Sequence, residues 1–150
     1  MAIVVRSVTS SVTLALRQRV LRPHQTIDEL AAEDLPHVEP AYFAAYDGAN
    51  VVGVASVDKE AAPWRPADAL AWRLRQMATD EAWRGQGIGR AVLDAVIRHV
   101  GEHGGGLLWC TARTPAVAFY RRSEFEPRGE PWDDPVLGPH IVMHRVVAAR

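Results

Sequence analysis

Seven residues near the middle of the chain, 84–90, have the composition of an anion-binding loop. They read RGQGIGR, with glycines at alternate positions, an arginine at each end and no acidic residue. An apolar pattern of helical period follows directly, so the glycines lie where a helix begins. Unpaired N–H groups at a helix N-terminus attract anions, and glycine lets an anion approach because no β-carbon blocks it. The segment predicts a phosphate-binding loop, and the alternative is a tight turn from strand to helix.

Two common phosphate motifs do not match these residues. A P-loop needs a lysine and a hydroxyl residue after its last glycine, but Gly89 is followed by Arg90 and Ala91. A dinucleotide fingerprint needs a small residue at position 90 or 92, where the chain has arginine and valine. The sequence therefore argues against nucleoside triphosphate, nicotinamide and flavin sites of these kinds.

Patterns of apolar residues predict the elements that must position this loop. We predict strands over 2–8, 41–46, 51–58, 69–79, 107–112, 124–129 and 141–147, and helices over 10–22, 27–32, 88–100 and from Thr114. Ser10 or Ser11 is the expected N-cap of the first helix, and Pro115 follows the Thr114 cap. This order predicts an α/β fold with a mixed sheet.

The strand that leads to the glycines has a clear two-residue alternation. Leu70, Trp72 and Leu74 fall on one face, and Arg73 and Arg75 fall on the other. We expect the apolar face to be buried and the arginines to point away from it.

Composition limits the kinds of protein that this chain can be. Its 150 residues are 48% hydrophobic and 23% charged with a net charge of −1, which suits one domain spanning 1–150. The mixed charges argue against nucleic acid and membrane surfaces as partners. The one cysteine, Cys110, excludes an internal disulfide and fits a buried thiol in a reducing compartment. With no leader-like or membrane-spanning segment visible, we expect a cytoplasmic protein.

Two segments resemble the markers of the GNAT superfamily of acetyl-CoA-dependent N-acetyltransferases. MATDEAWRGQGIG is similar to the family's Q/R-x-x-G-x-G/A segment, with Arg84, Gly87 and Gly89 on the motif positions. AVAFYRRSEF is similar to the later A-x-x-F-Y-x-x-x-G-F helix, except that Glu124 replaces the glycine. The order of elements also resembles the family's over nearly the whole chain. The resemblance implies a central, mostly antiparallel sheet with splayed parallel strands and flanking helices.

The resemblance implies acetyl-CoA as cosubstrate and a set of residues that contact it. The glycine segment would hold the pyrophosphate, and backbone groups of 77–79 would pair with the pantetheine arm and stabilise the oxyanion. Tyr120 would protonate the departing thiolate; the alternative is a core tyrosine bonded to a backbone partner. The implied cosubstrate contacts are Met77, Ala78, Thr79, Arg84, Gly85, Gln86, Gly87, Ile88, Gly89, Arg90, Arg113 and Phe119. Arg113 stands where many members have asparagine.

The general base is the least defined part of the site. The strand ending at Thr79 has no glutamate, which many members use as the base. His140 and His144 alternate onto one face of the last strand, where they could approach each other or one substrate pocket. We take His140 as a possible base, with water as the alternative. Acidic residues at 28, 29, 33 and 34 could attract a cationic amine or could form a solvated helix face. The other histidines lack metal-site spacing, so we predict no metal.

The sequence leaves two function classes open. The first is an enzyme that moves the acetyl group to a primary amine of a small molecule or peptide by direct attack, without a covalent intermediate. The second is a non-catalytic acyl-CoA-binding module of the same fold. A longer acyl group and a homodimer are also compatible with the sequence, and we expect loops 59–69 and 127–139 to influence acceptor choice.

Overall fold

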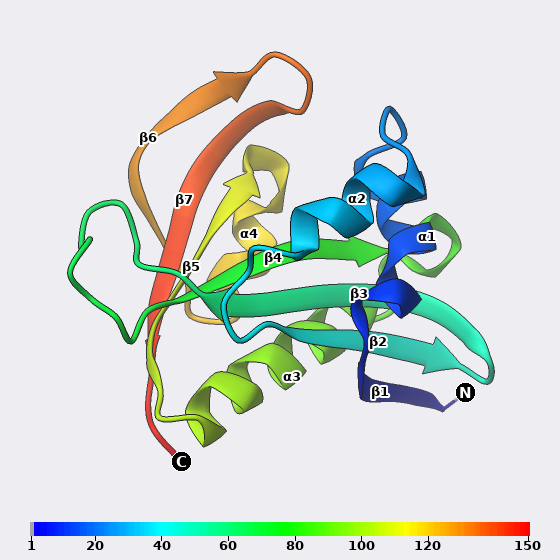
Figure 1. Ribbon diagram of the computed structural model, residues 1–150, viewed down its shortest axis with the longest axis horizontal. Helices are drawn as coiled ribbons and strands as arrows, with labels where there is room; N and C mark the ends of the chain where they lie inside the picture. The colour runs from blue at the N-terminus through cyan, green and yellow to red at the C-terminus, as the bar shows by residue number, and fades with distance from the viewer. Residues whose placement is uncertain (1) are drawn as a thin grey trace. The chain divides into compact units, whose positions relative to one another are not determined.

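The strands and helices follow one another in the predicted order (Figure 1). The computed structural model describes residues 2–150. The strands are β1 (Ile3–Val8), β2 (Ala41–Asp47), β3 (Asn50–Lys59), β4 (Trp72–Thr79), β5 (Gly106–Arg113), β6 (Glu126–Asp134) and β7 (Gly138–Val147). The helices are α1 (Ser10–Leu21), α2 (Ile27–Asp34), α3 (Ile88–Glu102) and α4 (Val117–Arg121), with short 3₁₀ turns at η1 (Glu81–Trp83) and η2 (Thr114–Ala116). Most strand pairs are antiparallel and β4 with β5 is a parallel pair, which confirms the predicted mixed α/β fold.

The chain forms two units, each with its own core. The first unit runs to Lys59 and includes Leu74–His99, and the second contains Glu60–Arg73 and Val100–Arg150. Strands β1, β2, β3 and most of β4 are successive neighbours in the first unit, and β5, β7 and β6 are successive neighbours in the second. Strand β4 begins in the second unit, where Trp72 pairs with Leu108 of β5. No helix within residues 2–150 is long and apolar enough to cross a membrane.

Helices cover both faces of the sheet in the first unit. On one face, Leu16 of α1 packs against Ala44, Val54 and Ala78 in a buried apolar cluster. On the other face, α3 approaches β3 closely at Gly53. A β-carbon there would lie 2.6 Å from Cγ2 of Ile88, the first residue of α3. Gly53 therefore allows the start of α3 to pack on the sheet.

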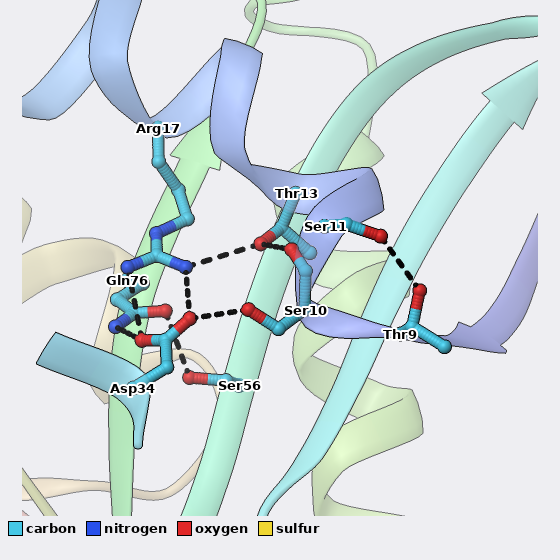
Figure 2. Close-up of polar contacts among 8 residues, drawn as sticks. All are labelled: Thr9, Ser10, Ser11, Thr13, Arg17, Asp34, Ser56 and Gln76. Carbon is cyan, nitrogen blue, oxygen red and sulfur yellow. Dashed lines mark hydrogen bonds and ion pairs between the residues drawn. The ribbon is translucent and has the colours of Figure 1, made fainter. Parts of the chain in front are cut away.

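A buried ion pair joins α1 to α2. Arg17 is 2% exposed and its Nη1 donates to Asp34 Oδ2 at 2.8 Å, while its Nη2 donates to Oδ1 at 3.1 Å (Figure 2). The predicted N-cap at Ser10 or Ser11 is wrong, because Thr9 is the N-cap and the Ser10 hydroxyl donates to Asp34 instead. Burial acts to raise the pKa of Asp34, but the hydrogen bonds from Arg17, Ser10 and Gln76 and the charge of Arg17 outweigh it and lower this pKa.

Strands β6 and β7 of the second unit are longer than predicted. The segment 127–139 was expected to be mainly loop, but β6 extends to Asp134 and pairs with β7. The pairing is irregular between Arg128 and Trp132, and this irregularity accommodates Gly129 and Pro131 at the end of the strand order. Tertiary pairing therefore overrides the turn-like composition of the segment.

Glu124 adopts the conformation of the glycine that it replaces. Its φ is +68°, in the left-handed region, just beyond the end of α4. Side chains are strained there, and the carboxylate of this exposed residue lies 3.6 Å from Nη1 of Arg145. The departure from the second family marker therefore changes the side chain without changing the turn.

We expect Arg17→Met to lower the free energy of unfolding by about 3–5 kcal/mol, because Asp34 would remain buried without its cation. Urea unfolding at neutral pH would measure this change. The double variant Arg17→Met, Asp34→Leu should recover much of the loss, since it removes both charges. A single variant within about 0.5 kcal/mol of the wild type would contradict the assignment.

We expect Glu124→Gly to raise the free energy of unfolding by about 1 kcal/mol, because glycine adopts positive φ without strain. Glu124→Ala is the matched control, since it removes the same carboxylate but keeps the strain. Thermal unfolding of the three proteins would compare them. Equal gains in both variants would mean that the carboxylate, rather than the backbone, is unfavourable at this position.

Candidate functional site

The glycine segment connects β4 to α3 in the first unit. The turn is anchored at Asp80, whose N–H donates to the Val52 carbonyl at 2.8 Å and whose Oδ1 accepts from the Ala82 N–H at 3.0 Å. Gly85 and Gly87 have φ values of +76° and +81°. Both glycines therefore occupy the left-handed region of backbone conformation. A residue with a β-carbon would be strained there, so this turn requires glycine at both positions.

The outer side of this turn is bare backbone. A β-carbon built on Gly85 or Gly87 would meet no other atom within 4 Å. The first hydrogen bond into α3 runs from the Ala91 N–H to the Gly87 carbonyl at 3.0 Å, so the N–H groups of 88–90 precede the regular helical pattern. Ile88 is buried and fixes this end of the helix. The segment fits a pyrophosphate, because exposed backbone and a positive helix end meet without side chains between them.

The arginines beside the glycines are both exposed. The Nε atom of Arg90 lies 3.2 Å from Asp94 Oδ1 on the helix surface. Such an exposed pair is worth about 0.3–0.5 kcal/mol, so it presents little barrier to a phosphate that competes for the guanidinium. Phosphate contact by Arg84 and Arg90 stays a prediction.

Strand β4 changes face at Gln76. Arg75 and Gln76 are consecutive, yet Arg75 bonds Asp58 at 2.7 Å and Gln76 bonds Ser56 at 3.2 Å. Ser56 and Asp58 are two residues apart on β3 and share a face, so regular alternation would not let both contacts form. Gln76 has a φ of +61°, which explains the exception. From Gln76 onward, even-numbered residues such as Ala78 occupy the face that Arg75 occupied before.

The predicted alternation is therefore confirmed only for the first half of the strand. Trp72 and Leu74 are buried as expected, but Leu70 lies before β4 and is 67% exposed. The change of face could not be read from the sequence, because nothing in RLRQMAT marks Gln76 as left-handed.

Carboxylates lie against β4 although the strand itself has none. Asp58 pairs with Arg75, and Glu60 lies 2.8 Å from Nη1 of Arg73. Asp58 is 2% exposed. Neither acid was predicted from the residues of β4 itself, although the alternation of Ser56 and Asp58 on β3 could have indicated one of them. Each of these carboxylates is paired with an arginine.

Tyr120 lies in α4 of the second unit and is 6% exposed. Its ring makes edge contacts with Phe119 and Phe125, and its hydroxyl shares a hydrogen bond with the Cys110 thiol. Burial, followed by the neighbouring Cys110, raises the pKa of Tyr120 well above its ordinary value. The hydroxyl therefore stays protonated at working pH and can serve only as a donor of its proton. The thiol partner of Tyr120 was not predicted from the sequence.

The two histidines of β7 share a face but do not come together. They lie four positions apart along the strand, a span of about 13 Å. His140 is 8% exposed, stacks on Trp132 and has Nδ1 2.8 Å from the Gly138 carbonyl. His144 contacts Trp64 and lines a groove with Glu124, Glu126, Arg145 and Val146. The two rings therefore do not approach each other, and their contact with one substrate pocket stays a prediction.

The surroundings of His144 change the pKa of its ring. Burial, and then the charge of Arg128, lower the pKa of His144, although Glu126 opposes the shift. His144 is therefore neutral near pH 7 and able to accept a proton. The base role of His140 stays a prediction.

The acidic residues of α2 divide into two groups. Asp28, Glu29 and Glu33 are exposed, and Glu29 also forms a capping box with Thr26. Asp34 is buried in the ion pair with Arg17, so it is no part of a solvated face. Only the first group is available to a cationic molecule.

The remaining predicted residues take defined places. Arg113 ends β5 opposite His140 and is the N-cap of η2, so the predicted Thr114 cap is displaced by one residue. Gly89 lies within the first turn of α3. Among residues 2–150, no group of three potential ligands could hold a metal ion.

Comparison with known proteins agrees with this geometry. Residues 39–127 match the model of the acetyltransferase (GNAT) domain. The chain is 32% identical over 145 residues to the uncharacterized N-acetyltransferase YitI of Bacillus subtilis (strain 168). The aligned region covers 95% of each of the two chains.

Two solved structures show the same fold at lower identity. The ribosomal-protein-S18-alanine N-acetyltransferase from Escherichia coli has a TM-score of 0.76 and 16% identity, over 99% of this chain and 96% of that chain. An aminoglycoside 6'-N-acetyltransferase complexed with coenzyme A has a TM-score of 0.74 and 14% identity, over 98% of both chains. On the family match and the similarity to YitI, this chain belongs to the GNAT acetyltransferase family.

Proposed function

We propose that this protein transfers the acetyl group of acetyl-CoA to a primary amine by direct attack. The observation that carries the proposal is the bare left-handed backbone at Gly85 and Gly87, at the start of α3 in a GNAT chain. This backbone would hold the pyrophosphate through N–H groups and the helix dipole. Arg84 would add charge-assisted contacts.

The end of β4 would bind the pantetheine arm. Residues 77–79 follow the change of face at Gln76 and are the last three residues of β4. Their polar groups would pair with the amides of the arm and stabilise the oxyanion. Bound acetyl-CoA supplies an acetyl group that is activated by a thiolate leaving group.

Tyr120 would donate a proton to that thiolate. Its raised pKa keeps the hydroxyl protonated even at alkaline pH, so the proton is present when the thiolate departs. Cys110 is a poor candidate for a covalent intermediate, since burial raises the pKa of its thiol to about 12. Direct transfer without an acyl-enzyme is therefore the mechanism that these groups favour.

The acceptor would be a small-molecule or peptide amine, which must lose a proton before attack. His140, as the sequence suggested, or His144, which is neutral near pH 7, would accept this proton, with water as the alternative. The exposed acids Asp28, Glu29 and Glu33 would favour the approach of a cationic amine. The two structural relatives act on a protein alanine and on an aminoglycoside, as their names state, so the shared fold does not select one acceptor.

One observation favours a non-catalytic acyl-CoA-binding module instead. The two carboxylates against β4, Asp58 and Glu60, are both paired with arginines, so neither resembles a free general base. Release of the CoA thiol in the presence of amines separates the two functions. Tight binding without thiol release across a broad amine panel would support the module.

We expect micromolar binding of acetyl-CoA to the wild type in a calorimetric titration. A Gly87→Glu, Gly89→Glu double variant should lose this binding, because its carboxylates repel phosphate and cover the bare backbone. Circular dichroism would verify that the variant is folded. A folded wild type that does not bind would reduce the glycine segment to a tight turn and remove the proposal.

We expect Tyr120→Phe to lower kcat by about 10²–10⁴-fold without changing the Kd of acetyl-CoA, because only proton donation is lost. Cys110→Ser is the control, since it keeps a hydroxyl partner for Tyr120 and removes the thiol. It should retain activity within a few-fold. Because the pKa of Tyr120 is raised, the wild-type rate should show no fall from tyrosine ionisation below about pH 10. Unchanged turnover in Tyr120→Phe would remove Tyr120 from the mechanism.

A further inference from the structure

Gln76 is a left-handed residue inside a strand. A non-glycine side chain with a φ of +61° is strained, and such a conformation persists only where its surroundings hold it. Gln76 directly precedes the backbone that would bind the pantetheine arm. The contacts that fix the conformation of Gln76 therefore also determine the orientation of that backbone.

Both ends of the Gln76 carboxamide are tied to other elements (Figure 2). Its Nε2 donates to Asp34 Oδ1 of α2 at 3.1 Å, and its Oε1 accepts from the Ser56 hydroxyl of β3 at 3.2 Å. A carboxamide is required for this pair of bonds, because one end must donate and the other must accept.

Asp34 is a rigid acceptor for this contact. Its carboxylate accepts two bonds from Arg17 and one from Ser10, and it is 7% exposed. Arg17 is fixed in turn by the hydroxyl of Thr13, which lies 3.2 Å from Nη1. The carboxylate therefore has little freedom to follow a displaced Gln76, and the network acts as a fixed point for β4.

We infer that Asp34 and Gln76 are positioning residues for acetyl-CoA: the Asp34 carboxylate holds the Gln76 carboxamide, which keeps residue 76 left-handed and orients the backbone of 77–79. This inference rests on the proposed function. It assigns α1 and α2 a part in coenzyme binding through the network, without direct contact. Neither residue is a catalytic residue in this role.

The decisive variant is Gln76→Glu, which keeps the shape but removes the donor. At pH about 7.5 the introduced carboxylate would face the ionised Asp34. The hydrogen bond to Asp34 would be lost, and repulsion between the two carboxylates would replace it. We expect the Kd of acetyl-CoA to rise at least about tenfold relative to the wild type. At pH about 5.5 the introduced carboxyl, its pKa raised by Asp34, would be protonated and could donate again, so the ratio of Kd values should fall toward one.

Gln25→Glu is the matched control. Gln25 Nε2 donates to Glu33 Oε1 at 2.7 Å on the exposed side of the same helical pair, so the substitution makes the same change opposite a carboxylate away from β4. Its Kd ratio should stay near one at both pH values. Using ratios removes the titration of the acetyl-CoA phosphates, which affects every protein equally. A purely structural role for Gln76 would lower thermal stability without the recovery of affinity at low pH.

Gln76→Gly provides a second test if the glutamate variant does not fold. Glycine adopts positive φ freely but makes neither side-chain bond, so we expect weaker acetyl-CoA binding than in the wild type. The inference would be overturned if Gln76→Gly bound acetyl-CoA as tightly as the wild type. It would also be overturned if folded Gln76→Glu had a Kd ratio near one at pH about 7.5. In both cases the proposed function would stand. Absence of binding by the wild type would instead overturn the proposed function, and the inference with it.

Discussion

The buried ion pair between Arg17 and Asp34 is the interaction on which the first unit depends. Two charges removed from water are favourable only when each is fully hydrogen-bonded, and Asp34 meets this condition with partners from α1 and β4. The low pKa of the carboxyl follows from the same contacts. One polar cluster therefore ties two helices and a strand together, where an apolar contact would have left their relative register less specific.

The glycine segment, residues 84–90, depends on a different constraint, the absence of side chains. A β-carbon on Gly85 or Gly87 would meet no other atom, so the left-handed backbone, rather than crowding, is the reason for glycine at both positions. At Gly53 the reason is packing, because Ile88 occupies the space where a side chain would be. Glycines on both sides of the strand-to-helix connection thus fix where α3 starts and what its first turn exposes.

The second unit contains a buried tyrosine whose hydroxyl stays protonated. Tyr120 is held between aromatic rings and bonded to a thiol that is itself too buried to ionise at neutral pH. Glu124, at the position of a family glycine, keeps the left-handed turn after α4 despite its side chain. The replacement of glycine by Glu124 is thus accommodated in a backbone conformation that favours glycine.

The sequence by itself determined the order of elements, the mixed fold and the glycine segment, because periodicity and glycine spacing are local signals. It also located Tyr120 through a short motif. The tertiary structure alone decided the partners of the polar groups. Asp34 forms a buried ion pair instead of a solvated helix face. Strand β6 extends through residues whose composition predicts a loop. The left-handed conformation of Gln76 reverses the faces of β4. These outcomes depend on side chains far apart in the chain, and no local pattern encodes which of them will meet.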